Sequence, residues 1–442
     1  MSDLLSLLSF GSNALSRTNS SISVTTNNVA NVDTEGYSRQ RTDDKSGDAV
    51  RVSDNLLSGQ VQTAAGSLAM SQAFADALSE LESGMTSGGT IDGDLGNLFS
   101  KMSSASAAPT DSASRDSVVA AARALVSGIQ RRASQAQTLR QEANQRIQDN
   151  AKSVTSLAKQ LASANTAVAK SGSAGALDAR DKIAKQLGQL VGGQARVDSD
   201  GQMRYTLENG AVLVDGQRAA ALTATPSPTT GMAKLEVVDG SSRRDVTASI
   251  TGGSTGAQLQ FRDQTVVGVQ NQLDQVASDV TTSFNAVHTA NAGLDGVSGR
   301  PLFTPLTGVS GAASAISLNP DVAANSKLLA FAAPGAGAGD NTGAVALFQL
   351  GSQNVASGGT KTLGDAAIDV VAGIAQSSSD AKGAVSRDSL VSDHLASLRD
   401  SLSGVDTQEE MTNLARFQNA SSAMTKVVSS INDMLGSLID AL

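Results

Sequence analysis

The chain has 442 residues, of which 40% are hydrophobic but only 2% aromatic, and its formal net charge is −9. The absence of cysteine excludes disulfides, thiolate metal sites and cysteine nucleophiles, and the acidic balance argues against nucleic acid as a partner. Hydrophobic cores must be built from aliphatic side chains, which suits closely packed helices better than an aromatic-lined ligand pocket.

The first stretch of the chain, from residue 4 to about residue 32, reads as one amphipathic helix. Leu8, Leu15, Ile22 and Val29 recur at a strict seven-residue spacing, which is typical of a helix that packs along another helix. Neither a basic region nor a small-residue cleavage pattern accompanies them, so we expect no cleaved secretion signal. No stretch approaches the roughly 20 apolar residues of a membrane span, so we also expect no membrane insertion.

Long helices are predicted to follow. Residues 50–60 read as mixed and extended, residues 56–81 as helical, and the Gly/Ser-rich stretch 83–90 as a break. The longest helical region runs from about residue 111 to residue 169, and its part rich in Gln, Arg and Ala, residues 131–150, is expected to be solvated. A period of 3.5 residues held over long helices favours an elongated bundle.

The pattern changes to a period of two after a shorter helix at 176–190. Met203, Tyr205 and Leu207 alternate with polar residues, and Asp-Gly and Asn-Gly pairs beside them favour hairpin turns. We therefore predict a small antiparallel β domain at residues 191–258, with strands continuing to residues 246–250. The adjacent arginines at 243 and 244 are predicted to lie in an exposed turn.

Helices return in the last part of the chain, at 266–290, 390–402 and 411–442. The first of these carries a buried face made of Leu273, Val276, Val280, Phe284 and Val287. In the last helix apolar residues recur at alternating steps of three and four, with Ser421 as the one polar member: Leu414, Phe417, Met424, Val428, Ile431, Leu435, Leu438 and Leu442. Negative charge at Glu409 and Glu410 suits the start of this helix.

These elements predict a mainly α fold with an inserted antiparallel β domain, in which both chain ends form an elongated helical bundle or coiled coil. Either terminal stripe alone would leave an apolar face in water, so the two ends are expected to pair. Each terminal helix is marginal by itself, because burying one face does not offset the entropy of ordering the segment. The expected division is 1–35 plus 404–442 as a terminal coiled-coil core, 36–190 plus 259–403 as a helical-bundle domain, and 191–258 as the β domain.

Candidate chemical groups are sparse. His288 and His394 lie on predicted helices without a second ligand at metal-binding spacing, so we expect structural roles and no metal or other cofactor. Asp198, Asp200 and Glu208 are the nearest candidates for a carboxylate hydrolase acting on cell-wall sugars, but they stand in turn contexts. This enzyme hypothesis is the weaker alternative, and we expect no catalytic residues.

Two terminal motifs resemble a known family. Residues 27–40 (NNVANVDTEGYSRQ), and residues 403–411 (SGVDTQEEM) with 413–418 (NLARFQ), are similar to the signatures of bacterial flagellar rod, hook and hook-associated proteins. Interior segments, among them residues 176–187, 261–263, 271–273 and 284–288, favour the hook–filament junction members over rod or hook proteins. The chain looks short for such members, so an additional outer domain of longer members is expected to be absent.

The resemblance implies a structural subunit of the extracellular flagellum, exported by the flagellar type III apparatus, that forms an adaptor ring joining hook to filament. Another axial subunit of the hook or rod type is the alternative. The implied partners are further copies in a homo-oligomeric ring, the hook protein, the next junction protein towards the filament, and a cytoplasmic export chaperone on the C-terminal helix. The predicted assembly interface comprises Leu8, Leu15, Ile22, Asn28, Val29, Asn31, Leu414, Phe417, Met424, Val428, Ile431, Leu435 and Leu438.

Overall fold

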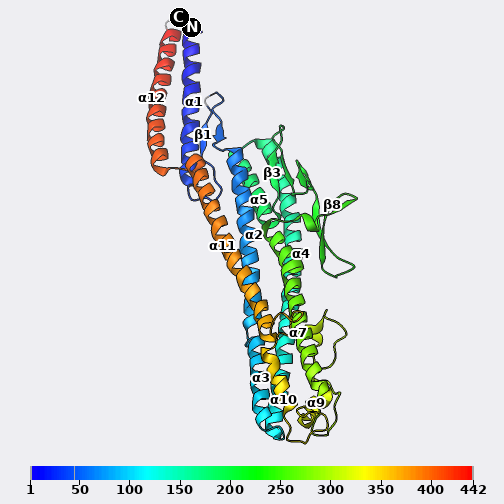
Figure 1. The fold of residues 1–442 in the computed structure, drawn as a ribbon. Helices are drawn as coiled ribbons and strands as arrows, with labels where there is room; N and C mark the ends of the chain where they lie inside the picture. Colours follow the sequence, from blue (N-terminus) through cyan, green and yellow to red (C-terminus); the bar gives the residue numbers. More distant parts are fainter. Residues whose placement is uncertain (1, 44, 441–442) are drawn as a thin grey trace. The chain divides into compact units, whose positions relative to one another are not determined.

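The computed structural model describes residues 2–43 and 45–440, and the predicted fold class is confirmed: the chain is mainly helical with antiparallel strands inserted in its middle (Figure 1). Contacts divide it into two compact units, the first made of three chain segments and the second of two. The first unit takes its residues from 1–70, 148–256 and 386–442, and the second from 71–147 and 257–385. Leu442, the last member of the predicted C-terminal stripe, lies outside the described residues.

The first unit contains the terminal helices and the strands. Its elements are α1 (Ser2–Ala30), β1 (Gln40–Thr42), β2 (Ala49–Arg51), α5 (Ala174–Val191), β3 (Gln194–Val197), β4 (Met203–Thr206), β5 (Val212–Asp215), β6 (Arg218–Ala219), β7 (Ala221–Pro226), β8 (Ala233–Asp239), β9 (Ser242–Asp245), the 3₁₀ turn η1 (Thr247–Ser249) and α12 (Thr407–Asp440).

The second unit is helical. Its elements are α3 (Ile91–Ala107), the π-helical turn η2 (Phe261–Thr265), α7 (Val266–Ala290), α8 (Ala312–Ala315), α9 (Pro320–Ala324), η3 (Ser326–Leu328), α10 (Thr342–Gln349) and η4 (Leu350–Ser352). Four further helices have residues in both units: α2 (Asn55–Thr86), α4 (Ser112–Ser171), α6 (Gly253–Gln260) and α11 (Leu363–Ser403).

The inserted strands form two antiparallel sheets, in the orders β3-β4-β5-β6 and β7-β8-β9. Met203 and Tyr205 alternate into the interior as predicted, and both are buried. The Asn165 side chain of α4 holds β4 by donating to the Met203 carbonyl (2.8 Å) and accepting from the Met203 N–H (2.9 Å). Because Asn165 is itself buried, these two bonds fix the sheet to α4.

Two details of the β prediction are wrong. Residues 246–250 do not continue the strands, since η1 occupies this stretch. The last strand is instead β9, which contains Arg243 and Arg244, residues predicted to lie in a turn. β9 pairs only with β8 and is exposed along its length, and charged side chains are commonly found on such edge strands.

The second unit has a core of aliphatic side chains with a small aromatic centre. The predicted face of α7 is confirmed, since Leu273, Val276, Val280 and Phe284 are buried. The Phe284 ring stacks on Phe99 at 5.6 Å between centroids. Phe99 of α3 and Phe284 of α7 therefore form the aromatic centre of this core.

The expectation that residues 131–150 are solvated is wrong. Ala136, Leu139 and Ala143 continue the buried stripe of α4, and Arg132 is itself buried. The Arg132 guanidinium donates to the carbonyls of Met85 and Gly128, both at 2.8 Å, and to that of Gly89. Small alanines permit close helix packing along this stretch. The carbonyls at the end of α2 accept hydrogen bonds from the Arg132 guanidinium, which composition alone would place in water.

His288 is a buried residue of α7 whose imidazole is bonded on both sides. Its Nδ1 lies 2.6 Å from the Arg300 carbonyl oxygen, and its Nε2 accepts from the Ala330 N–H at 2.9 Å. These partners require a neutral ring with the proton on Nδ1. Burial lowers the pKa of His288 to about 4.

We expect this histidine to make the stability of the protein depend on pH. Between pH 6.5 and pH 4 the unfolded chain binds a proton at His288 that the folded chain does not, so the free energy of unfolding falls as pH falls, by about 2 kcal/mol from pH 7 to pH 5. Urea unfolding at the two pH values measures this change, and His288→Gln is expected to flatten the slope. An unaltered slope in that variant would contradict the assignment.

None of the helices in the described residues is both long and apolar enough to cross a membrane. Within residues 2–43 and 45–440, no group of three or more potential metal-ligating side chains converges on one point.

Candidate assembly interface

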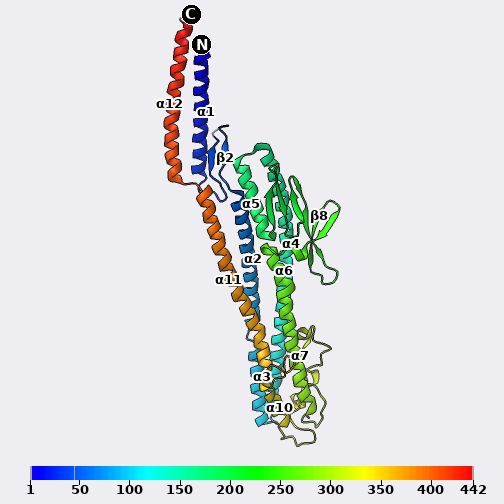
Figure 2. The same cartoon turned by 45° about the horizontal axis from the view of Figure 1, so that its top comes forward.

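The helices from the two ends of the chain, α1 and α12, pack side by side in the first unit (Figures 1 and 2). On the contact face of α1, large residues alternate with small or polar ones such as Gly11. A Cβ added at Gly11 would lie 3.1 Å from Cγ2 of Val428, so the glycine allows the two backbones to approach closely. Further along, the Ser421 hydroxyl donates to Oδ1 of Asn19 at 3.1 Å.

The predicted stripe residues lie on the contact faces but are mostly half-buried. Ile431 is the most enclosed, with 2% of its surface exposed, whereas Leu438 remains 39% exposed. Two helices shield each other on one side only, so the rest of each stripe is open. The half-buried members of the predicted set are Leu8, Leu15, Ile22, Val29, Leu414, Phe417, Met424, Val428 and Leu435.

Further apolar side chains on the helix pair lie outside these contact faces. Phe10 is 70% exposed on α1, and Val427 is 47% exposed on α12. The other exposed apolar side chains of the pair are Leu5, Leu7, Met411, Met434 and Ile439. In a two-stranded coiled coil, positions flanking the seam are usually charged, and a set of exposed apolar side chains marks a surface that contacts another protein.

The two asparagines of the predicted interface have partners within the chain. Asn28 is fully buried, and its side chain accepts from Tyr37 Oη and the Gln40 N–H, both at 2.9 Å, and donates to the Gln40 carbonyl. Asn31 donates to the Asn27 carbonyl at 2.9 Å. The structure therefore brings Asn28 to strand β1 rather than to the outer surface of the helix pair.

Sequence reasoning missed the ion pairs at the base of the helix pair. Arg39 Nε donates to Glu410 Oε1 at 2.7 Å, and Arg39 Nη2 donates to Glu409 Oε1 at 2.5 Å. Asp406 caps the helix by accepting from the N–H groups of Gln408 and Glu409. The two glutamates, predicted only to suit the helix dipole, therefore also bind a guanidinium about 370 residues earlier in the chain, for which no local sequence signal exists.

Burial raises the pKa of Tyr37 to about 12, and the negative charges of Asp178 and Glu410 act in the same direction. The phenol is thus a neutral donor to Asn28 over the whole physiological pH range. The hydrogen bond from Tyr37 to Asn28 therefore persists when pH changes around neutrality.

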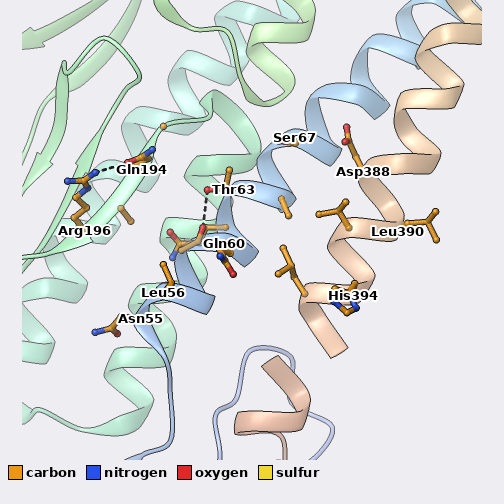
Figure 3. Close-up of a pocket in the computed structure, with 17 residues that line it drawn as sticks. Asn55, Leu56, Gln60, Thr63, Ser67, Gln194, Arg196, Asp388, Leu390 and His394 are labelled. Atoms are coloured by element: carbon orange, nitrogen blue, oxygen red, sulfur yellow. Dashed lines mark hydrogen bonds between the residues drawn. The ribbon is translucent and has the colours of Figure 1, made fainter. Parts of the chain in front are cut away.

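A groove with a volume of about 820 Å³ lies between α2, β3 and α11 in the first unit (Figure 3). Leu56 of α2 and Leu390 of α11 expose most of their surface there, while Gln194 and Arg196 come from β3. His394 lines the same groove, so its placement is at a surface rather than in a core. The lining is an apolar surface with scattered polar groups rather than an arranged acid, base and nucleophile.

The three carboxylates of the hydrolase hypothesis stabilise turns and hairpins. Asp198 lies 3.4 Å from Arg204 across the β3–β4 hairpin, and Asp200 accepts from the Gln202 N–H at 3.0 Å. Glu208 accepts from the Thr251 hydroxyl. Each of these contacts stabilises a turn or a hairpin of the β region itself.

Comparison with known proteins identifies relatives of this chain. A family model described as the flagellar hook-associated protein FlgK helical domain matches residues 78–303, which is more than half of the chain. Models of the flagella basal body rod protein and of the flagellar basal body rod FlgEFG protein C-terminal match residues 8–37 and 400–441.

Curated relatives and a solved structure agree with these matches. Flagellar hook-associated protein 1 of Salmonella typhimurium is 25% identical over 328 residues, covering 68% of this chain and 59% of the relative's length. The protein of the same name from Escherichia coli is 22% identical over 543 residues, covering 98% of this chain and 99% of the relative. The structure of the flagellar hook junction protein FlgK from Burkholderia pseudomallei has the same fold, with a TM-score of 0.70, 18% identity, and coverage of 78% of this chain and 100% of that chain.

Proposed function

Since the chain belongs to the flagellar hook-associated protein FlgK family, we propose that it is a structural subunit that joins hook to filament in the bacterial flagellum. The observation that carries this proposal is the pair α1/α12, in which the two chain ends meet and several apolar side chains stay exposed. In an isolated monomer these side chains stay in contact with water, whereas an assembling subunit buries them against its neighbours.

The proposed assembly has two kinds of contact. Stripe residues such as Ile431 hold α1 to α12 within one subunit, and exposed residues such as Phe10 and Val427 contact neighbouring copies in a ring. We further propose that residues 1–35 and 404–442 form the inner layer, surrounded by the helical region 36–190 plus 259–403 and by the β insert 191–258. In this division the apolar surface of the terminal helices lies in the inner layer, where several helices can pack against it.

The proposed partners follow from the family. They are the hook protein on one side of the ring, the next junction protein towards the filament on the other, and an export chaperone that holds the C-terminal helix before assembly. Export by the flagellar type III apparatus to an extracellular position, and a role without catalysis, complete the proposal.

Deleting residues 407–442 is expected to abolish assembly and motility while the β insert stays folded. Without α12 the stripe of α1 has no partner, and the subunit loses the exposed apolar side chains of α12. Swimming of a null strain complemented with the truncated chain measures the functional loss, and sedimentation of the purified chain measures assembly. Fluorescence of Tyr205, the one tyrosine left after Tyr37→Phe, reports on the β insert because this side chain is buried there.

A shorter deletion, of residues 414–442, serves as the matched variant. It keeps Glu409 and Glu410, so the ion pairs with Arg39 can form and only the helix pair is lost. Both deletions are expected to be non-motile. A truncated chain that still joined hook to filament would contradict the proposed role of the α1/α12 pair in this function.

A further inference from the structure

A continuous set of polar contacts runs from the start of α12 to the β insert, entirely within the first unit. It begins at Arg39, which binds the carboxylates of Glu409 and Glu410 through two different nitrogens. The backbone N–H of Arg39 also donates to the Ser403 carbonyl at 2.8 Å, at the end of α11. The segment before β1 is therefore joined to both helices that flank the turn at 404–406.

The next contacts join this segment to α5. The backbone N–H and the hydroxyl of Ser38 donate to the two oxygens of Asp178, at 3.1 and 2.8 Å. Arg51 Nη1, on strand β2, bridges Asp178 at 3.1 Å and Asp181 at 2.6 Å. One turn of α5 thereby receives donors from both sides of the β1–β2 hairpin.

The last contact reaches the β insert. Arg180, adjacent to Asp181 on α5, donates to the Gly201 carbonyl at 2.8 Å, in the turn between β3 and β4. Several of the charged groups are buried: the side chains of Glu410, Arg51 and Asp178 are 3%, 8% and 11% exposed. A buried ion pair is costly to break on one side, because the remaining charge has no water to replace its partner.

We infer that the segment Tyr37–Gln40 is an internal clamp, and that Arg39 and Asp178 are the positioning residues that set how the α1/α12 pair leaves the rest of the first unit. The stripes fix α1 and α12 to one another, but a helix pair can swing as one body about the turn at 404–406. Contacts at the first turn of α12 oppose this swing most directly, because Glu409 and Glu410 lie beside the turn. Arg39 is suited to the task since its planar fork binds two carboxylates at once, which a lysine cannot do with the same geometry.

The inference rests on the proposed function only for its consequence: subunits whose helix pairs point in one direction can add to a ring, and subunits whose pairs swing cannot. The segment that resembles the family signature is thus assigned to contacts within one subunit. The geometry of this segment is a property of the free chain, and it can be measured without assembly.

The test uses the cysteine-free chain with pairs of introduced cysteines carrying spin labels. Ser422→Cys with Gln186→Cys measures α12 against α5, and Ser12→Cys with Ser422→Cys measures α12 against α1; all three positions are exposed. We expect Arg39→Ala to broaden the α12–α5 distance distribution and to leave the α12–α1 distribution unchanged. Amide exchange in the first turns of α12 is expected to become about tenfold faster.

Three further variants sharpen the result. Asp178→Asn is expected to broaden the α12–α5 distribution as well, and Arg39→Lys to give a distribution between those of the alanine variant and the parent chain. Arg41→Ala, two residues further along the chain in strand β1 and exposed, is the matched control and is expected to change nothing. An α12–α5 distribution in Arg39→Ala as narrow as in the parent chain would overturn the inference.

The outcome separates this inference from the proposed function. If the parent chain fails to assemble but Arg39→Ala frees the helix pair, the proposed function falls and the clamp stands. If the parent chain assembles and Arg39→Ala assembles equally well with an unchanged distance distribution, the clamp falls and the proposed function stands.

Discussion

Replacing Ile431 by aspartate is expected to separate α12 from α1 and to abolish assembly. Ile431 is the most enclosed residue of α12 on the contact face. An uncompensated buried charge costs about 3–5 kcal/mol, which a pair of half-buried helices does not recover from its remaining contacts. The effect is expected both in the free chain and in the assembled state.

Disulfide formation between introduced cysteines measures this separation. Asn19→Cys and Ser421→Cys replace residues whose polar atoms lie 3.1 Å apart, so the two thiols can reach each other while the helices are paired. Ile431→Asp is expected to slow their oxidation strongly and to eliminate sedimenting assemblies. Ser429 is exposed on the same helix, two positions before Ile431. Ser429→Asp is therefore the control, and it is expected neither to slow the oxidation nor to eliminate the assemblies.

A contrasting variant distinguishes the two proposed kinds of contact. Val427 is exposed on the same helix, so Val427→Asp is expected to leave cross-linking intact and to weaken assembly. Cross-linking at the parent rate in Ile431→Asp would contradict the pairing of the two stripes. Normal assembly of Val427→Asp would remove this residue from the proposed subunit contact.

The largest expected loss of stability comes from Phe284→Ala in the second unit. Phe284 is fully buried, stacks on Phe99 at 5.6 Å and meets Phe303 edge-on at 5.7 Å. Truncation removes the central ring of this cluster and leaves a cavity that rigid helices fill only in part. We expect the free energy of unfolding to fall by about 3–5 kcal/mol.

Denaturant unfolding followed by circular dichroism measures this loss. Phe348→Ala is the matched control, because Phe348 lies on α10 of the same unit and is 43% exposed. We expect the control to change the unfolding free energy by much less than the core variant. Similar losses in the two variants would mean that the aromatic cluster does not carry the core.

The sequence alone was sufficient for elements that show one regular period over a long stretch. The terminal helices were predicted within a few residues of α1 and α12, and the buried face of α7 was read from its spacing. The alternation around Tyr205 predicted the buried face of strand β4 correctly. In each case a single face is buried, so the apolar pattern repeats the geometry of the element.

Local signals in the sequence also mark α3, which the periodic patterns above leave out. α3 has Thr90 as its N-cap, with Asp92 and Asp94 in the first turn, and buries Leu95 and Leu98 at helical spacing, which together are a complete helix signature. By contrast, the short hairpin of β1 and β2 has three residues in each strand, too few for any period to be recognised. Its existence depends on contacts with other segments, among them the Asn28 side chain that binds Gln40.

The tertiary structure decided the contacts between distant polar groups. The polar stretch around Arg132 predicts that this side chain is solvated. In the fold it is buried, and it donates to a carbonyl at the end of α2. Glu410 was assigned to a helix dipole, yet it binds Arg39. Periodicity indicates which face of an element is apolar. A polar residue gives no comparable indication of whether water or another part of the chain will form its hydrogen bonds. The paired ends of this protein were therefore determined by sequence, and the clamp at their base only by the fold.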